Sequence, residues 1–122
     1  IYNSSCENIE VKNNKNLDKL KDILGFIEKN YQHSISIEGI SSFCNFSPSH
    51  FMKFFKKSMG TSFIDYLNDY RLSASARMLL SSDDNIIDIA AACGYDNLSY
   101  YNRIFKRKYH VTPSKYRNSG II

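Results

Sequence analysis

The chain has 122 residues, with 16 Lys and Arg against 12 Asp and Glu, for a formal net charge of +4. This length allows one compact domain, or two small lobes, and excludes a large catalytic architecture of the barrel type. The chain is therefore moderately basic. Its net charge excludes a polycationic tail but no other class of protein.

The cysteines, histidines and apolar runs exclude further classes of protein. Three cysteines without a CxxC spacing and three scattered histidines do not indicate a metal site, so we expect no metal or cofactor and a reduced, cytoplasmic protein. No apolar run approaches the roughly 20 residues of a membrane span, and no signal peptide is visible, so we expect no membrane contact. Because the chain begins at Ile1 rather than Met, we expect a piece of a longer protein, with a sensor or dimerisation domain upstream.

The first half of the chain begins with a polar segment and continues as helices. Residues 1–16 are Asn-rich and aperiodic, which predicts a flexible lead-in or interdomain linker. Leu17 then opens an amphipathic helix, for which Asn16 is the expected N-cap. Two helices capped by serine are expected next, over 36–44 and 47–59, the second ending at Gly60.

The second half continues the helical pattern. A long helix is expected over 62–81, beginning with Ser62 and Asp65 in a capping-box arrangement. Its predicted inward stripe is Phe63, Leu67, Tyr70, Ala74 and Met78. Three helices should follow, one over 86–93, one from Asp96 or Asn97 to about Tyr109, and one over 113–117. Strand-like alternation is absent, so the expected fold is all-α with seven helices.

The chain contains an internal repeat. Residues 37–66 align with residues 87–116, with Cys44 on Cys93 at an offset of 49 and Phe51 on Tyr101 at an offset of 50. Each copy has the pattern of a short apolar helix, a tight turn and a longer helix that opens with polar residues. This is the helix-turn-helix arrangement, whose second helix enters the major groove of DNA. Duplicated helical hairpins that serve packing alone are the alternative.

The charges and polar residues of the two copies favour DNA. With the aromatic residues inward, the exposed stripes are Ser49, Met52, Lys53 and Lys56 in one copy, and Ser99, Asn102, Arg103 and Lys106 in the other. Arg and Lys can reach guanine and Asn can reach adenine in the major groove. The net charge is +3 over 39–64 and +6 over 97–122, against −4 over 65–96 and −1 over 1–38. The length of the helix expected over 62–81 also suits DNA. A helix of about twenty residues is about 30 Å long, near the roughly 34 Å between successive major grooves on one face of DNA. One chain could therefore contact two adjacent grooves.

The stretch IIDIAAACGYDNLSYYNRIFKRKYHVTPSKYR (86–117) resembles the signature of the AraC/XylS family of bacterial transcription regulators. The resemblance extends over about 17–117 and implies two helix-turn-helix subdomains joined by a linker helix. The implied boundaries are a first subdomain at 17–61, the linker helix at 62–81, a second subdomain at 82–118 and a tail at 119–122. His110 stands where the family usually has Gly, so we expect local strain there.

The resemblance also implies which residues meet DNA. The base-facing set it implies is Ser49, Met52, Lys53, Ser99, Asn102 and Arg103, with Asn97 and Leu98 near the start of the second reading helix. The expected phosphate contacts are Lys56, Lys57, Lys106, Lys108 and Arg117, which would add affinity but little sequence information. Ser49 and Met52 are poor hydrogen-bond donors, so we expect the first subdomain to rely on thymine-methyl contact and DNA shape.

The functional prediction is a sequence-specific, double-stranded-DNA-binding regulator of transcription without catalytic activity. It would insert its two recognition helices into successive major grooves and act with RNA polymerase and an upstream domain of the same chain. The alternative is a helical protein-interaction module, for example one that docks on RNA polymerase with little DNA affinity of its own.

Overall fold

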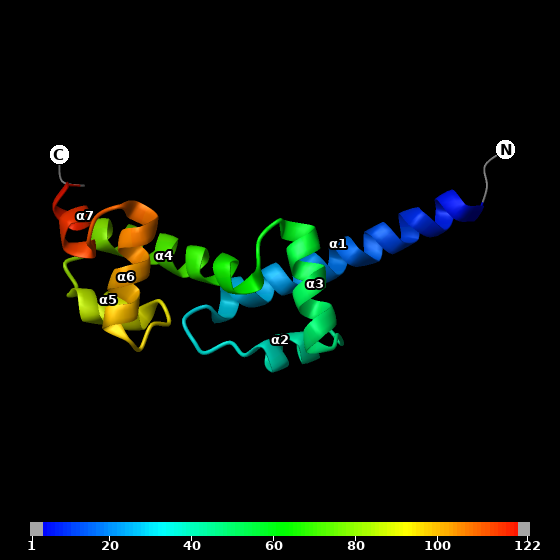
Figure 1. Cartoon of the computed structure of the whole chain (residues 1–122), viewed down its shortest axis with the longest axis horizontal. Helices are drawn as coiled ribbons and strands as arrows, with labels where there is room; N and C mark the ends of the chain where they lie inside the picture. Colours follow the sequence, from blue (N-terminus) through cyan, green and yellow to red (C-terminus); the bar gives the residue numbers. More distant parts are fainter. Residues whose placement is uncertain (1–3, 120–122) are drawn as a thin grey trace. The chain divides into compact units, whose positions relative to one another are not determined.

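The structure is a computed structural model that describes the backbone of residues 4–119 and the side chains of residues 14–119. Seven helices and no strand occur within 4–119, which confirms the predicted all-α class (Figure 1). The helices are α1 (Ser4–Asn30), α2 (Ile37–Phe43), α3 (Pro48–Met59), α4 (Phe63–Ser81), α5 (Ile86–Ala92), α6 (Leu98–Tyr109) and α7 (Pro113–Ser119).

The helix ends follow from side chains that the sequence places there. The hydroxyl of Ser36 accepts a hydrogen bond from the Gly39 amide at 2.9 Å, and that of Ser47 accepts one from the His50 amide at 3.1 Å. At the starts of α5 and α6 the carboxamide oxygens of the Asn N-caps do the same, at 2.8 and 2.9 Å. These four caps pair amides that have no partner within their own helix.

The first helix is longer than predicted. α1 begins at Ser4 rather than Leu17, so Asn16 is an interior residue and not the N-cap. The prediction was wrong because it required an apolar stripe. A helix that continues beyond its packed part needs none, and Lys and Glu are good helix formers. The role of 1–16 as a linker stays a prediction. Residues 1–3 of this segment, and 120–122 of the predicted tail, lie outside the described residues.

The chain divides into two compact units, here called the first unit and the second unit. The first unit takes in the chain up to Lys29 together with Ile35–Phe63, and the second takes in Asn30–Ser34 and the chain from Ile64 onwards. Each unit therefore holds one short helix and one longer helix of the repeat, α2 with α3 and α5 with α6.

The core of the first unit is built from aliphatic and phenylalanine side chains. Ile23 and Ile27 of α1 and Ile40 of α2 are fully buried. The rings of Phe51 and Phe55 meet the ring of Phe63 edge-on, with centroid distances of 5.2 and 5.7 Å. Such edge-to-face pairs stabilise a core beyond the area that they bury.

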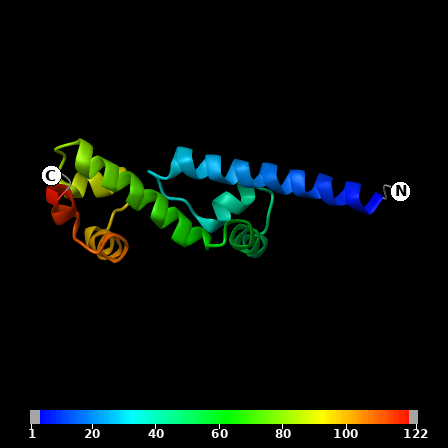
Figure 2. The ribbon, with the colours of Figure 1, turned by 90° about the horizontal axis from the view of Figure 1, so that it is seen from above.

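The core of the second unit surrounds α4. The predicted stripe of α4 is only partly right, because Tyr70 and Met78 are half-buried while other side chains of the helix are buried on further faces. These additional buried residues are Leu72, Ser75, Ala76 and Leu79. They occur because α4 has neighbours on more than one side, which leaves no single apolar stripe to detect. Figure 2 shows α5, α6 and α7 gathered around the C-terminal part of α4.

Candidate nucleic-acid interface

In the first unit, α2, a tight turn and α3 form the first helix-turn-helix. The turn holds Asn45 in the left-handed region, with φ of 60°, and the Phe46 amide donates to the Ser41 carbonyl oxygen at 2.9 Å. Phe51 and Phe55 of α3 are buried. The opposite face of α3 is exposed, and it carries the four residues predicted for it, Ser49, Met52, Lys53 and Lys56.

In the second unit, α5, α6 and the turn between them repeat this geometry. Gly94 takes the left-handed position, with φ of 95°, and the Tyr95 amide donates to the Ala90 carbonyl oxygen at 2.9 Å. Tyr101, Ile104 and Phe105 of α6 are buried. The exposed face of α6 carries the four predicted residues, Ser99, Asn102, Arg103 and Lys106.

Two further residues predicted to approach bases lie at the start of α6. Asn97 is exposed, and its carboxamide oxygen caps the helix by accepting from the Tyr100 amide, which leaves the amide NH₂ as a donor. Leu98 is half-buried and packs against the core of the second unit. Asn97 therefore has donors to offer a ligand, whereas much of Leu98 serves the core.

A polar network that sequence reasoning missed supports Arg103. The Arg103 guanidinium lies over the ring of Tyr100, with its central carbon 5.3 Å from the ring centroid. The Tyr100 hydroxyl accepts from the Asn68 amide at 3.2 Å, and the Asn68 carboxamide oxygen accepts from the Tyr95 hydroxyl at 2.9 Å. The ring that underlies Arg103 is thus tied to α4. Only the spacing of Tyr100 and Arg103 on one helix face could have indicated this contact.

The predicted phosphate contacts fall into two groups. Lys56, Lys57 and Lys106 are exposed. Lys108 is half-buried, and its ammonium donates to the Asp69 carbonyl oxygen at 3.1 Å and to the Ser73 hydroxyl at 3.0 Å, with the Asp69 carboxylate 3.6 Å away.

Arg117 is also bound within its own unit. Its Nε donates to the Leu79 carbonyl oxygen at 3.0 Å, and one terminal nitrogen donates to the Ser82 carbonyl oxygen at 3.2 Å. These carbonyls lie at the end of α4, where helices leave acceptors without partners. Phosphate contact by Lys108 and Arg117 stays a prediction, and both side chains have a structural use.

Arg71 is a further, half-buried cation that sequence reasoning did not place at the turn of the second helix-turn-helix. Its guanidinium donates to the carbonyl oxygens of Tyr31 and His33, both at 2.8 Å, and lies over the Tyr95 ring. Burial lowers the pKa of Arg71 from its ordinary value. A Cβ on Gly94 would lie 2.5 Å from the Tyr31 carbonyl oxygen and 2.8 Å from the Arg71 Nε. Glycine is therefore required at this turn by close packing as well as by its φ angle.

The two buried cysteines lie at equivalent positions and are held in the neutral form. Burial raises the pKa of the Cys93 thiol to about 11, and it also raises the pKa of the Cys44 thiol. A neutral, buried thiol is a poor nucleophile and a poor metal ligand. Among residues 14–119 no group of three His, Cys, Asp or Glu side chains is arranged to hold a metal ion. In the described part of the chain, every helix is too short or too polar to cross a membrane.

Comparison with known families identifies the chain. The family described as a helix-turn-helix domain matches residues 40–119, which is more than half of the chain. This match spans both α2–α3 and α5–α6, the two halves of the repeat. The chain belongs to the AraC/XylS family.

A curated relative is the "bifunctional transcriptional activator/DNA repair enzyme AdaA" of Bacillus subtilis. It is 32% identical over 95 residues, which cover 78% of this chain and 45% of the relative. The chain thus spans less than half the length of the curated relatives that it matches first.

Solved structures of this fold include two DNA-binding or regulator domains. The C-terminal domain of the two-component response regulator yesN from Fusobacterium nucleatum has a TM-score of 0.79 and 28% identity, and covers 82% of this chain and 98% of that domain. The DNA-binding domain of AdpA, solved with a target DNA, has a TM-score of 0.79 and 20% identity, and covers 82% of this chain and 90% of that one. At 20% identity the second likeness shows the fold alone.

As a member of the AraC/XylS family, the chain departs from the usual pattern at His110. This residue ends α6 in the left-handed region, with φ of 67°, where the family usually has Gly. Gly60 ends α3 with φ of 75° and donates its amide to the Lys56 carbonyl oxygen, as His110 does to that of Lys106. The expected strain at His110 therefore has a structural basis, because a side chain with a Cβ is disfavoured at positive φ.

Proposed function

We propose that this chain is the sequence-reading part of a bacterial regulator of transcription and binds double-stranded DNA with α3 and α6. The observation that carries the proposal is the pair of exposed faces at equivalent positions of these two helices. Each face combines hydrogen-bonding and cationic side chains close to the start of a helix whose other side is buried. A helix of this kind fits the major groove, where such side chains reach base edges.

The proposal gives the two faces different tasks. Arg103 and Asn102 of α6 are well suited to guanine and adenine, whereas Ser49 and Met52 of α3 are suited to thymine methyl groups and groove shape. Lys56, Lys57 and Lys106 supply attraction to the DNA backbone. Both helices would enter successive major grooves of one duplex.

Membership of the AraC/XylS family supports a role in transcription, in the bacterial cytoplasm where the chromosome lies. RNA polymerase and a sensor or dimerisation domain of the same polypeptide are the further partners that we propose. We also propose that the chain itself catalyses no reaction, although the AdaA relative is a repair enzyme over its full length. This part of the proposal is supported by buried, neutral thiols at Cys44 and Cys93.

Selection of duplexes from a random pool, followed by binding measurements at several salt concentrations, tests the proposal. If six to eight phosphates are neutralised, log K should fall against log salt with a slope of about −5 to −7. Enrichment of one sequence motif together with this slope is the expected result. A flat salt response with no enriched motif would overturn the proposal and favour a protein-interaction module.

A further inference from the structure

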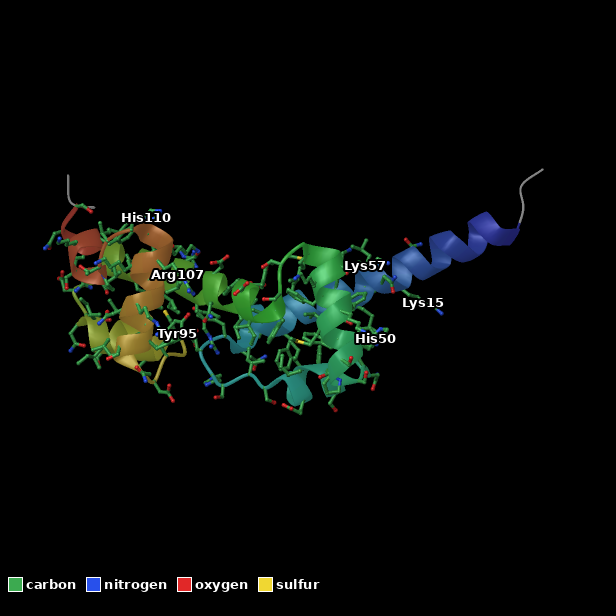
Figure 3. All side chains as sticks on the ribbon, in the orientation of Figure 1. Lys15, His50, Lys57, Tyr95, Arg107 and His110 are labelled. Atoms are coloured by element: carbon green, nitrogen blue, oxygen red, sulfur yellow. The ribbon has the colours of Figure 1, made fainter. Side chains whose placement is uncertain are left out.

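A hollow lies beside α3 within the first unit, on a flank of the recognition helix. Its volume is about 540 Å³, and it is lined by Asn16, His50, Lys53, Phe54, Lys57 and Ser58. Figure 3 shows His50 and Lys57 on the side of α3 toward Lys15 of α1. The hollow is therefore formed by α3 together with the part of α1 where the sequence predicted a flexible lead-in.

The chemistry of the hollow suits a phosphate group. Among the described residues its lining contains two lysines and no acidic side chain. His50 is exposed, with its ring edge-on to Phe46 at 4.3 Å and parallel to the Phe54 ring at 6.5 Å. These rings restrict the imidazole, which carries an N–H donor in either protonation state. Asn16 and Ser58 add an amide and a hydroxyl as further donors.

The hollow continues the reading face of α3 to one side. His50, Lys53 and Lys57 are spaced i, i+3 and i+7, so they form a row beside the row that ends in Lys56. A helix in the major groove turns its front to the bases and its flanks to the two sugar-phosphate walls. The row with His50 and Lys57 is such a flank, and Lys53 belongs to both rows.

We propose that this hollow binds the DNA backbone, taking one or two phosphates of the strand that borders the groove read by α3. The proposal rests on the proposed function. It makes α1 part of the DNA interface through Asn16, and it assigns to Lys57 and His50 the contacts that position α3. It also adds to the affinity of the first unit, whose reading face has only weak hydrogen-bonding groups at Ser49 and Met52.

At the matching positions of the second unit, several residues that line the hollow are replaced. Ile104 replaces Phe54 and is buried, and Lys108 replaces Ser58 and is bound to Asp69 and Ser73. The position of His50 is held by Tyr100, whose ring lies under Arg103. We therefore expect the phosphate site in the first unit, so that its occupant lies at one end of the bound sequence, although Arg103 and Arg107 match Lys53 and Lys57 and are also exposed.

The test scans the selected duplex with single neutral methylphosphonates, using the whole chain and fluorescence anisotropy. Replacing one or two phosphates at the first unit's groove should weaken wild-type binding by about tenfold, since a charge-assisted hydrogen bond is worth about 1.5 kcal/mol or more. Lys57→Ala should lose a similar factor and become insensitive to the same substitution. Lys29→Ala is the matched control, because Lys29 is exposed on α1 and does not line the hollow.

The possible outcomes separate this proposal from the proposed function. If Lys57→Ala binds the duplex with the wild-type affinity and the wild-type methylphosphonate profile, the hollow is not a backbone site, and the proposed function stands. If inorganic phosphate binds in the hollow of the wild type without competing with the duplex, its occupant is a free phosphate and the backbone proposal is overturned. If the wild type binds no duplex, both proposals fail. Thermal unfolding checks that each variant is folded.

Discussion

The two helix-turn-helix units share a sequence pattern and a geometry, but different forces hold their recognition helices. In the first unit α3 is held by the packing of apolar side chains, with Phe51 and Phe55 packed on Phe63. In the second unit α6 is held both by apolar packing and by polar contacts to α4. One of these contacts is the hydrogen bond from the Asn68 side chain to the Tyr100 hydroxyl. A helix held by directional hydrogen bonds has a more closely defined orientation, which suits a face that reads bases with Arg103 and Asn102.

The same comparison extends to the left-handed positions of the backbone. The turn holds Asn45 in the first unit and Gly94 in the second, while the helix end holds Gly60 in the first and His110 in the second. Each unit therefore has one glycine and one residue with a side chain at these positions, in opposite places. Only at Gly94 does packing against Tyr31 and Arg71 forbid a side chain. Equivalent backbone geometry thus need not mean equivalent tolerance to substitution.

The largest expected effect compares Gly94→Ala with Gly60→Ala. Both variants put a Cβ at positive φ, but only at Gly94 would the new atom meet the Tyr31 backbone and the Arg71 guanidinium. Gly94→Ala should lower the free energy of unfolding by about 3 kcal/mol, and Gly60→Ala by about 1 kcal/mol. Urea unfolding measures both values. Equal losses in the two variants would show that the contact with Tyr31 does not matter.

A second comparison concerns base reading by the two units. Arg103→Ala should weaken binding to the selected duplex by about 1–3 kcal/mol and relax discrimination at one base pair. Ser49→Ala and Met52→Ala should alter the selected sequence less than Asn102→Ala does. Selection from random DNA with each variant makes the measurement. If Arg103→Ala instead weakened binding equally on all DNA sequences, Arg103 would be a phosphate contact and not a base contact.

A third comparison concerns the pair Phe51 and Tyr101, which occupy the same place in the repeat and are both fully buried. The Tyr101 hydroxyl makes no well-formed hydrogen bond among the described residues, although the Ser75 side chain lies near it, and burial raises its pKa to about 12. Tyr101→Phe should therefore stabilise the chain by up to about 1 kcal/mol. Phe51→Tyr should destabilise it by about 1–3 kcal/mol, because it buries a new hydroxyl. Thermal unfolding gives the sign, and a loss of stability in Tyr101→Phe would contradict the assignment.

The smallest expected effect concerns the ends of α3 and α6. His110→Gly should raise the free energy of unfolding by about 0.5–1 kcal/mol, because glycine adopts positive φ without strain. The reciprocal change Gly60→His should lower it by a similar amount. Urea unfolding measures both changes, as shifts of the midpoint concentration with an unchanged dependence of the free energy of unfolding on urea concentration. A destabilised His110→Gly variant would mean that the imidazole makes a contact that outweighs its strain.

Periodicity and capping residues predicted the helices and the outward faces well, because both are local properties. The caps at Ser36 and Ser47 and the exposed stripes of α3 and α6 were confirmed. The start of α1 was missed because polar helical residues carry no apolar period. The structural use of Arg117 was missed because it depends on carbonyl groups at the end of α4, which is 35 or more residues away in the chain.

The division of the chain into two units has a practical consequence for experiments on one unit alone. Asn30–Ser34 belongs to the second unit, although it lies in the sequence between α1 and α2. A fragment that starts at residue 64 would lose the Tyr31 and His33 carbonyl oxygens, and the half-buried Arg71 guanidinium would lack both acceptors. A fragment designed to express the second unit alone should therefore begin upstream of Tyr31, or it should carry an apolar residue in place of Arg71.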